Sequence, residues 1–264
     1  KHRFNNRLSF VGCLHSQYLF INNSAAVEPR FNVRYGINSK HAISAGYGLN
    51  HQAQSIYTYY VQTPSASGAL LTNEQLGFTR ANQYVVTYDW LIANKLRLKL
   101  EGYYQELSNV PVSSNITSYS AINSGSSFVP DNEDSLVNNG TGTNYGLEVT
   151  LEKFFSDSYY FLVTGSLFDS KYKGSDGIER NTAFNTGYVL NVLGGKEVML
   201  PSKESAKYKK SIAFDMKATI AGGQRYTPIN LEASKLANEA IYDTRNPYSE
   251  QFANYFRTDV RIAF

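Results

Sequence analysis

Histidine and cysteine side chains are the groups in this sequence best suited to acid–base, redox or metal chemistry. The chain has one cysteine, Cys13, and four histidines, which are His2, His15, His41 and His51. No histidine is in HExxH spacing, and no GxSxG or Walker motif occurs. A single cysteine excludes a CxxC motif and an internal disulfide. We therefore expect that the protein has no metal site and no cofactor and that it is not an enzyme.

Three tyrosines in one segment are candidates for binding a ligand. The segment "QAQSIYTYYVQ" (52–62) brings Tyr57, Tyr59 and Tyr60 close together. Clustered aromatic rings can stack on a sugar, an aromatic chelator or a peptide. The same rings could instead anchor the segment where a membrane meets water. With that alternative open, we predict these three tyrosines as substrate-binding residues.

The segment "GGQRYTPI" (222–229) is a second candidate. Gly222 and Gly223 remove side chains at a strand end, beyond which Arg225 and Tyr226 follow. A structural bend alone explains such glycines. The guanidinium and the phenol could also contact a ligand, so Arg225 and Tyr226 complete the predicted substrate-binding set.

An acidic segment, "KGSDGIERN" (173–181), is similar to turns that hold a cation. It lacks the ligand spacing of a calcium loop. It therefore predicts a turn and adds no metal site.

Composition limits the class of protein. Of the 264 residues, 42% are hydrophobic and 18% are charged, with 21 Tyr, 15 Phe and a net charge of +3. So small a charge does not indicate a nucleic-acid partner. No run of apolar residues approaches the length of a membrane-spanning helix. This does not exclude a membrane β-barrel, because its strands alternate apolar and polar residues and contain no such run. The opening "KHRFNNRLSF" has no signal peptide, and we expect a piece of a longer protein.

Alternation of apolar and polar residues is the dominant pattern of the chain. In "LRLKLE" (96–101) every leucine is followed by a charged residue. A period of two indicates a β-strand with two different faces. Roughly ten segments share the pattern, and no amphipathic helix interrupts them. They are 7–20, 31–37, 43–49, 83–90, 95–107, 147–152, 159–170, 188–198, 212–220 and 256–264.

The connections between these segments alternate in length. Short turns rich in Asn, Asp and Ser are typical of hairpins, whereas long structureless loops are unusual in soluble domains. Outer-membrane barrels combine both, with short turns at one end and long loops at the other. The predicted turns are 38–41, 93–94 and 156–158, and the predicted loops are 52–79, 108–143, 173–187 and 230–254.

The apolar face of the predicted sheet could contact either a protein core or membrane lipid. A soluble antiparallel sheet also alternates, with its apolar face against a core. Here Tyr84, Trp90, Tyr104 and Tyr145 lie near strand ends, where the aromatic girdles of a membrane barrel would be. The polar faces carry both charge signs, which suits a wet lumen. We predict an all-β fold, an antiparallel transmembrane β-barrel whose apolar face meets lipid.

Four segments resemble the carboxy-terminal barrel half of TonB-dependent outer-membrane receptors, in the branch that carries a carboxypeptidase-regulatory-like domain. They are "VEPRFNVRYGINSKHAISAGYGLNHQAQSIYTYY" (27–60), "EGYYQELSNVPV" (101–112), "GSLFDSKYKGSDGIERNTAFNTGYVLNVLGGKE" (165–197) and "GGQRYTPI" (222–229). The resemblance implies a barrel of about 22 strands with a plugged lumen, in the outer membrane of a Gram-negative bacterium. It further implies TonB-dependent active transport of a scarce nutrient, which could be a siderophore, haem, glycan or peptide.

The same resemblance implies which parts and partners the barrel needs. We interpret residues 1–264 as a barrel segment, without the plug and amino-terminal domains, and expect two more strands after "FRTDVRIAF". The expected partners are the lipid bilayer, the remaining strands, the plug, a TonB-type energy-coupling protein and the nutrient. Because ten strands would enclose too narrow a lumen, segments 7–20 and 255–264 are predicted not to pair with each other.

Two alternatives to transport remain open. One is a non-transporting barrel that scaffolds a surface or assembly complex. The other is an outer-membrane peptidase with Asp pairs and an Asp–His couple at the rim, where the candidates are Asp131, Asp134, Asp176, Asp243 and His51. In the lumen, charged residues are predicted to pair with each other or with a plug, namely Asp215, Lys217, Arg257, Asp259 and Arg261.

Overall fold

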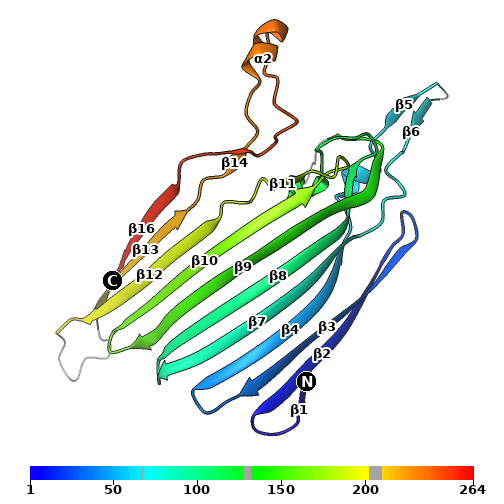
Figure 1. The fold of residues 1–264 in the computed structure, drawn as a ribbon. Coiled ribbons are helices and arrows are strands. Elements are labelled where there is room, and N and C mark those ends of the chain that lie inside the picture. Colours follow the sequence, from blue (N-terminus) through cyan, green and yellow to red (C-terminus); the bar gives the residue numbers. More distant parts are fainter. Residues whose placement is uncertain (67, 126, 128–131, 202–209) are drawn as a thin grey trace.

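One large antiparallel sheet dominates the computed structural model, which describes residues 1–66, 68–125, 127, 132–201 and 210–264 (Figure 1). Its ten long strands have 9 to 21 residues each. They are β2 (Leu8–Leu19), β3 (Ser24–Gly36), β4 (His41–Gln52), β7 (Thr79–Ala93), β8 (Leu96–Ser113), β9 (Leu136–Ser156), β10 (Tyr159–Lys173), β12 (Tyr188–Met199), β13 (Ser211–Ala221) and β16 (Tyr255–Ala263).

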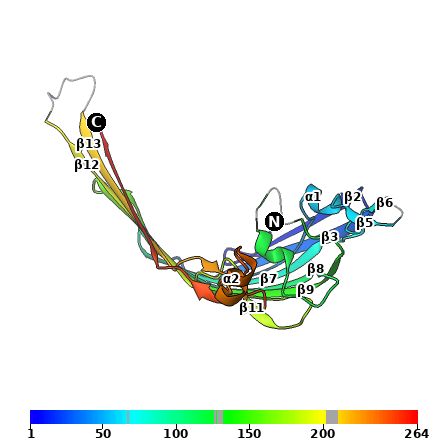
Figure 2. The same cartoon turned by 90° about the horizontal axis from the view of Figure 1, so that it is seen from above.

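The long strands follow one another in chain order across the sheet, so each pairs with its neighbours in sequence. The short strand β1 (His2–Arg3) pairs with β2 at one edge, and β16 forms the other edge. Seen from above, the sheet is bent into an open trough (Figure 2). No ladder joins β2 to β16 in the described ranges, which confirms the predicted absence of closure.

Short elements occupy the connections. The strands are β5 (Thr63–Ser65), β6 (Gly68–Leu70), β11 (Glu179–Asn181), β14 (Arg225–Tyr226) and β15 (Glu250–Gln251). The helices are α1 (Ile56–Tyr59), the 3₁₀ helix η1 (Ala121–Ser124) and α2 (Leu231–Ala237). Across the described residues, none of the helices has the length and apolar character needed to pass through a membrane.

The two faces of the sheet differ as the alternation predicts. A Cβ on Gly142 would lie 2.7 Å from Cδ1 of Ile122 in η1, which lies on the concave side (green, Figure 2). Because the register of β9 with β10 is regular from 141 to 152, Glu148 and Thr150 share that concave face. Leu147 and Val149 therefore face outward, where they are 65% and 44% exposed. The outward face is therefore apolar, and no described element packs over it.

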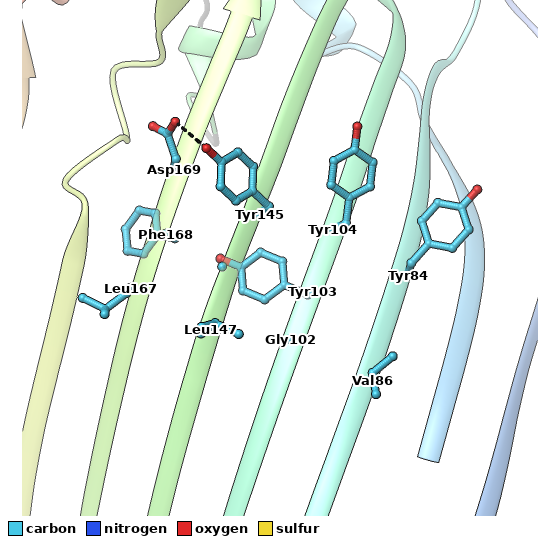
Figure 3. A pocket seen from close by; sticks show the side chains of 11 residues that line it. Tyr84, Val86, Gly102, Tyr103, Tyr104, Tyr145, Leu147, Leu167, Phe168 and Asp169 are labelled. Atoms are coloured by element: carbon cyan, nitrogen blue, oxygen red, sulfur yellow. Dashed lines mark hydrogen bonds between the residues drawn. The ribbon is translucent and has the colours of Figure 1, made fainter. Parts of the chain in front are cut away.

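Aromatic rings form a belt on the outward face. Tyr84, Tyr104 and Tyr145 lie side by side on β7, β8 and β9, above Leu147 and other aliphatic residues (Figure 3). The Tyr145 hydroxyl donates to the Asp169 carboxylate over 3.2 Å. At the opposite end of the strands, Trp90 stacks on His41. The prediction that these residues lie near strand ends is confirmed for Trp90, three residues before the end of β7. It is wrong for Tyr104 and Tyr145, which lie near the middle of β8 and β9 because both strands are longer than predicted.

Most connections segregate by length, although the four-residue turn 20–23 between β2 and β3 lies at the same end as the long ones. The hairpin turns at 37–40, 94–95 and 157–158 lie at one end of the strands, and the connections 53–78, 114–135, 174–187 and 222–254 lie at the other (Figure 1). The predicted loop 108–143 was too long, because β8 continues to Ser113 and β9 begins at Leu136. The pairing there passes through two register shifts, near Val110, and these break the alternation on which the prediction relied.

Gly222 and Gly223 let the last loop dock against its neighbours. A Cβ on Gly222 would lie 1.8 Å from the carbonyl oxygen of Thr186, and one on Gly223 would lie 2.0 Å from that of Phe252. Neither backbone oxygen can move without breaking the local structure. The glycines therefore serve a close backbone approach, in line with the structural bend considered from the sequence.

The outward face predicts a sharp contrast between neighbouring residues. Val149→Arg should cost about 2–4 kcal/mol, because it places a charge in hydrocarbon, and should reduce the folded fraction in the outer membrane. Thr150→Arg adds the same charge to the concave face and should assemble normally. The mobility of unheated protein on SDS gels measures both. Equal assembly of the two variants would mean that the outward face does not meet lipid.

The glycine contacts predict a second contrast. Gly223→Ala should displace the 222–254 loop and speed its cleavage by added protease. Gly77→Ala is the control, since its Cβ would lie 3.8 Å from the nearest atom, Oδ1 of Asn138, an ordinary contact. Limited proteolysis of assembled protein measures the rates. Identical digestion of both variants would contradict the docking role.

Candidate functional site

Charged residues on the concave face pair with each other, both across strands and along a single strand. Asp89 accepts hydrogen bonds from Arg34 over 2.6 Å and from Nε of Arg97 over 2.9 Å. Near the last edge, Arg257 pairs with Asp259 at 2.7 Å, and Arg261 lies 3.9 Å from Asp215. The predicted pairing is therefore present for these residues, and Lys217 lies opposite Asp259 in the ladder. The concave face is built for contact with water.

Glu28 forms a buried polar cluster that sequence reasoning missed. Its carboxylate, 1% exposed, accepts hydrogen bonds from Gln17 at 2.6 Å, from Arg30 at 2.7 Å and from the backbone NH of His51 at 2.6 Å. Nδ1 of His15 is 2.8 Å from the same group. Glu28 lies outside the segments predicted as strands, and the cluster depends on three strands meeting. It ties β2, β3 and β4 together near the loop end.

The tyrosine segment splits into buried and exposed residues. Tyr57 and Tyr60 are 55% and 56% exposed, and Tyr59 is 1% exposed. The Tyr59 hydroxyl accepts from the backbone NH of Gln54 over 3.2 Å, and burial raises the pKa of this phenol. Tyr59 belongs to the loop core and is closed to a ligand in this conformation. Ligand contact by Tyr57 and Tyr60 stays a prediction.

That loop core joins two long connections. Tyr59, Leu76 and Leu136 form a buried apolar cluster. Beside it, the fully buried amide of Asn73 donates to the carbonyls of Thr58 and Glu133 and accepts from the NH of Leu136. The connections 53–78 and 114–135 are therefore held together as one unit.

Arg225 and Tyr226 are held within the loop structure. Nε of Arg225 donates to the carbonyl of Asn185 over 2.8 Å, which ties the 222–254 loop to the 174–187 loop. The Tyr226 ring stacks on Phe252 with centroids 4.4 Å apart. These contacts account for both residues structurally, and their contact with a substrate stays a prediction.

The acidic turn at 173–181 is closed by an internal ion pair. Arg180 lies 2.8 Å from Asp176, and its hydrogen bond holds the pKa of that carboxyl below its usual range. Gly177 has a φ of +71°, as a tight turn requires. In the described ranges, no group of three or more His, Cys, Asp or Glu side chains could hold a metal ion. The segment is a turn, as predicted.

The rim residues considered for a peptidase do not meet in the described structure. His51 lies 3.6 Å from Glu28, Asp176 pairs with Arg180, and Asp243 accepts from Asn246. Asp131 lies outside the described residues. Across the described ranges, no ion pair or hydrogen bond joins a histidine to an aspartate.

A pocket of about 610 Å³ lies between the loops and the upper strand ends. Gln54 and Thr58 come from the first long connection, Tyr119 and Ile122 from the second, and Phe184 from the third. Sequence reasoning missed these residues because they come from connections far apart in the chain. The only available signal was an isolated aromatic, Phe184, in the polar stretch "RNTAFNTG" (180–187).

Comparisons with known proteins agree with this architecture. Residues 4–264 match the family described as "TonB dependent receptor-like, beta-barrel". No curated protein matches the sequence significantly. The outer membrane transporter YddB from Escherichia coli superposes with a TM-score of 0.65 at 13% identity, over 97% of this chain and 36% of that one. The ferric-catecholate import receptor Fiu from E. coli K12 superposes with a TM-score of 0.58 at 9% identity, over 91% and 29%.

The extent of the family match decides the classification. It spans almost the whole chain, whereas the chain spans about a third of each of these two solved structures. The antiparallel sheet and the family match confirm the predicted fold class. The family match also confirms the predicted outer-membrane location. This chain belongs to the TonB-dependent receptor family, as part of a β-barrel of the Gram-negative outer membrane.

Proposed function

We propose that this chain is the carboxy-terminal half of the barrel of a TonB-dependent transporter that actively takes up a scarce nutrient. The observation that carries the proposal is the polar concave face, where Asp89 bridges Arg34 and Arg97, beneath loops that border a pocket. A wall that only needed to fold would gain nothing from so many charged groups. Its wet interior suits passage of a solute.

The open edges define the nearest partners. In hydrocarbon, an unpaired backbone NH or C=O costs several kcal/mol. We propose that β2 and β16 pair with further strands of the same protein, in a barrel of about 22 strands. The concave face would then enclose a plug, on which a TonB-type protein acts. Import by Fiu, as its description states, supports this direction of transport.

Energy coupling provides the direct test. Deleting the gene should slow growth when one nutrient is limiting, and deleting the TonB-type partner should reproduce that defect, because uptake requires both. Growth is measured on a panel of limiting iron and carbohydrate sources. The wild-type gene should restore growth only in cells that retain the partner.

The opposite result would favour a scaffold. If loss of the TonB-type partner leaves growth unchanged on every medium while loss of the gene removes a co-purifying surface protein, transport is wrong. The barrel would then have a function that does not require the TonB-type partner.

Orientation gives a further prediction. The long connections should face the cell exterior and the hairpin turns the periplasm. Ser65→Cys, in the exposed β5, should react with an impermeant maleimide on intact cells, and Ser39→Cys should not. The background should be Cys13→Ser, since Cys13 is exposed. Labelling at Ser39 but not at Ser65 would reverse the orientation.

A further inference from the structure

The loop pocket, which is partly open to solvent, has the size of a ligand site. Its volume of about 610 Å³ lies within the range of about 300–1,000 Å³ for small-molecule pockets. It lies on the concave side, because Ile122, which lines it, packs over Gly142. A solute entering the lumen from the loop end would pass this pocket.

Among the described residues, the pocket is lined without charge. None of its sixteen lining residues, all within the described ranges, is acidic or basic. Transfer of an anion into such a site is unfavourable, since no cation would replace the water it loses. The lining therefore disfavours ligands that present several carboxylates or ionised catechols.

The lining combines hydrogen-bonding groups with apolar surface. Gln52, Gln54 and Thr58, which carry two amides and a hydroxyl, line the pocket, and the Gln54 amide also donates to Thr79 over 2.9 Å. The hydroxyl of Ser124 also belongs to the lining, is buried, and has no hydrogen-bond partner among the described residues. Amides and hydroxyls bind the hydroxyl groups of an uncharged polar ligand without a desolvation penalty for charge.

An aromatic ring supplies the apolar surface. Phe184 is 53% exposed, and its ring lies against the backbone of Gly125, where a Cβ would be 2.5 Å from Cζ. Gly125 has a φ of +56°, which also favours glycine. One side of the Phe184 ring therefore contacts the backbone of Gly125, and the remaining surface of the ring is accessible. An open ring beside amides and hydroxyls matches a sugar, which has apolar CH groups and a rim of hydroxyls.

We propose that this pocket binds an uncharged glycan, as the substrate site of the transporter proposed above. The role of the glycan as a transported substrate rests on that proposed function. The choice of a glycan as the ligand class rests on the residues that line the pocket. The pocket is preorganised, because Asn73 and the Tyr59 cluster hold together two of the loops that form it.

Binding to the purified full-length protein in detergent tests the proposal. An array of uncharged oligosaccharides is the first probe, and haemin, a ferric catecholate complex and uncharged peptides are the competitors. Dissociation constants are then measured by calorimetry for the tightest glycan. Phe184→Ala should weaken binding at least tenfold. Ile178→Ala is the matched control, since Ile178 is an exposed apolar residue of the same connection and lies outside the pocket.

The outcomes separate the ligand class from transport itself. Glycan binding that depends on Phe184 and not on Ile178 supports the proposal, provided that both variants keep the gel mobility of folded barrel. Binding of haemin, the ferric complex or a peptide that depends on Phe184 overturns the glycan class and leaves transport standing. Failure of every uncharged glycan to bind the folded protein also overturns it, while the growth test reports on transport independently.

Discussion

Backbone hydrogen bonding in hydrocarbon is the constraint on which the rest of this structure depends. Lipid offers no partner to an NH or a C=O, so each spanning strand must pair along its length with its neighbours. The ladder between β8 and β9 meets this demand without interruption from Leu96 opposite Lys153 to Leu107 opposite Gly142. A continuous ladder also fixes side-chain direction, since paired residues share a face. One requirement thus produces both the apolar wall and the polar interior.

The polar interior, in turn, depends on small residues. Tyr103 lies across Gly146 on the next strand, where an added Cβ would be 2.8 Å from its hydroxyl. Gly195 likewise leaves room for the hydrogen bond from Tyr160 to Asp215. Long lumenal side chains can reach a partner on a neighbouring strand only where the residue between them is small. These glycines reflect packing, although in sequence they appear as breaks in the strand pattern.

Sequence alone could predict the features that repeat along the chain. The period of two identified all ten long strands and both faces, and turn composition identified the hairpin turns at 37–40, 94–95 and 157–158. Features that join distant segments were out of reach. Tyr57, Tyr59 and Tyr60 are alike in sequence, yet only Tyr59 is buried, because Leu76 and Leu136 pack against it. The same limit applies to Glu28 and to the pocket, whose parts come from separate strands and connections.

The candidate site lies where the backbone constraint is relaxed. Near the loop end, β8 and β9 pass through register shifts, and Val110 and Val112 are 2% and 0% exposed. Shifts of this kind are tolerable outside hydrocarbon, because water and loop residues can satisfy the freed backbone groups. There the strands no longer have to present one face to lipid, and side chains from both can pack beneath the loops. The chain thereby changes from a wall one sheet thick into a packed structure that can enclose a pocket.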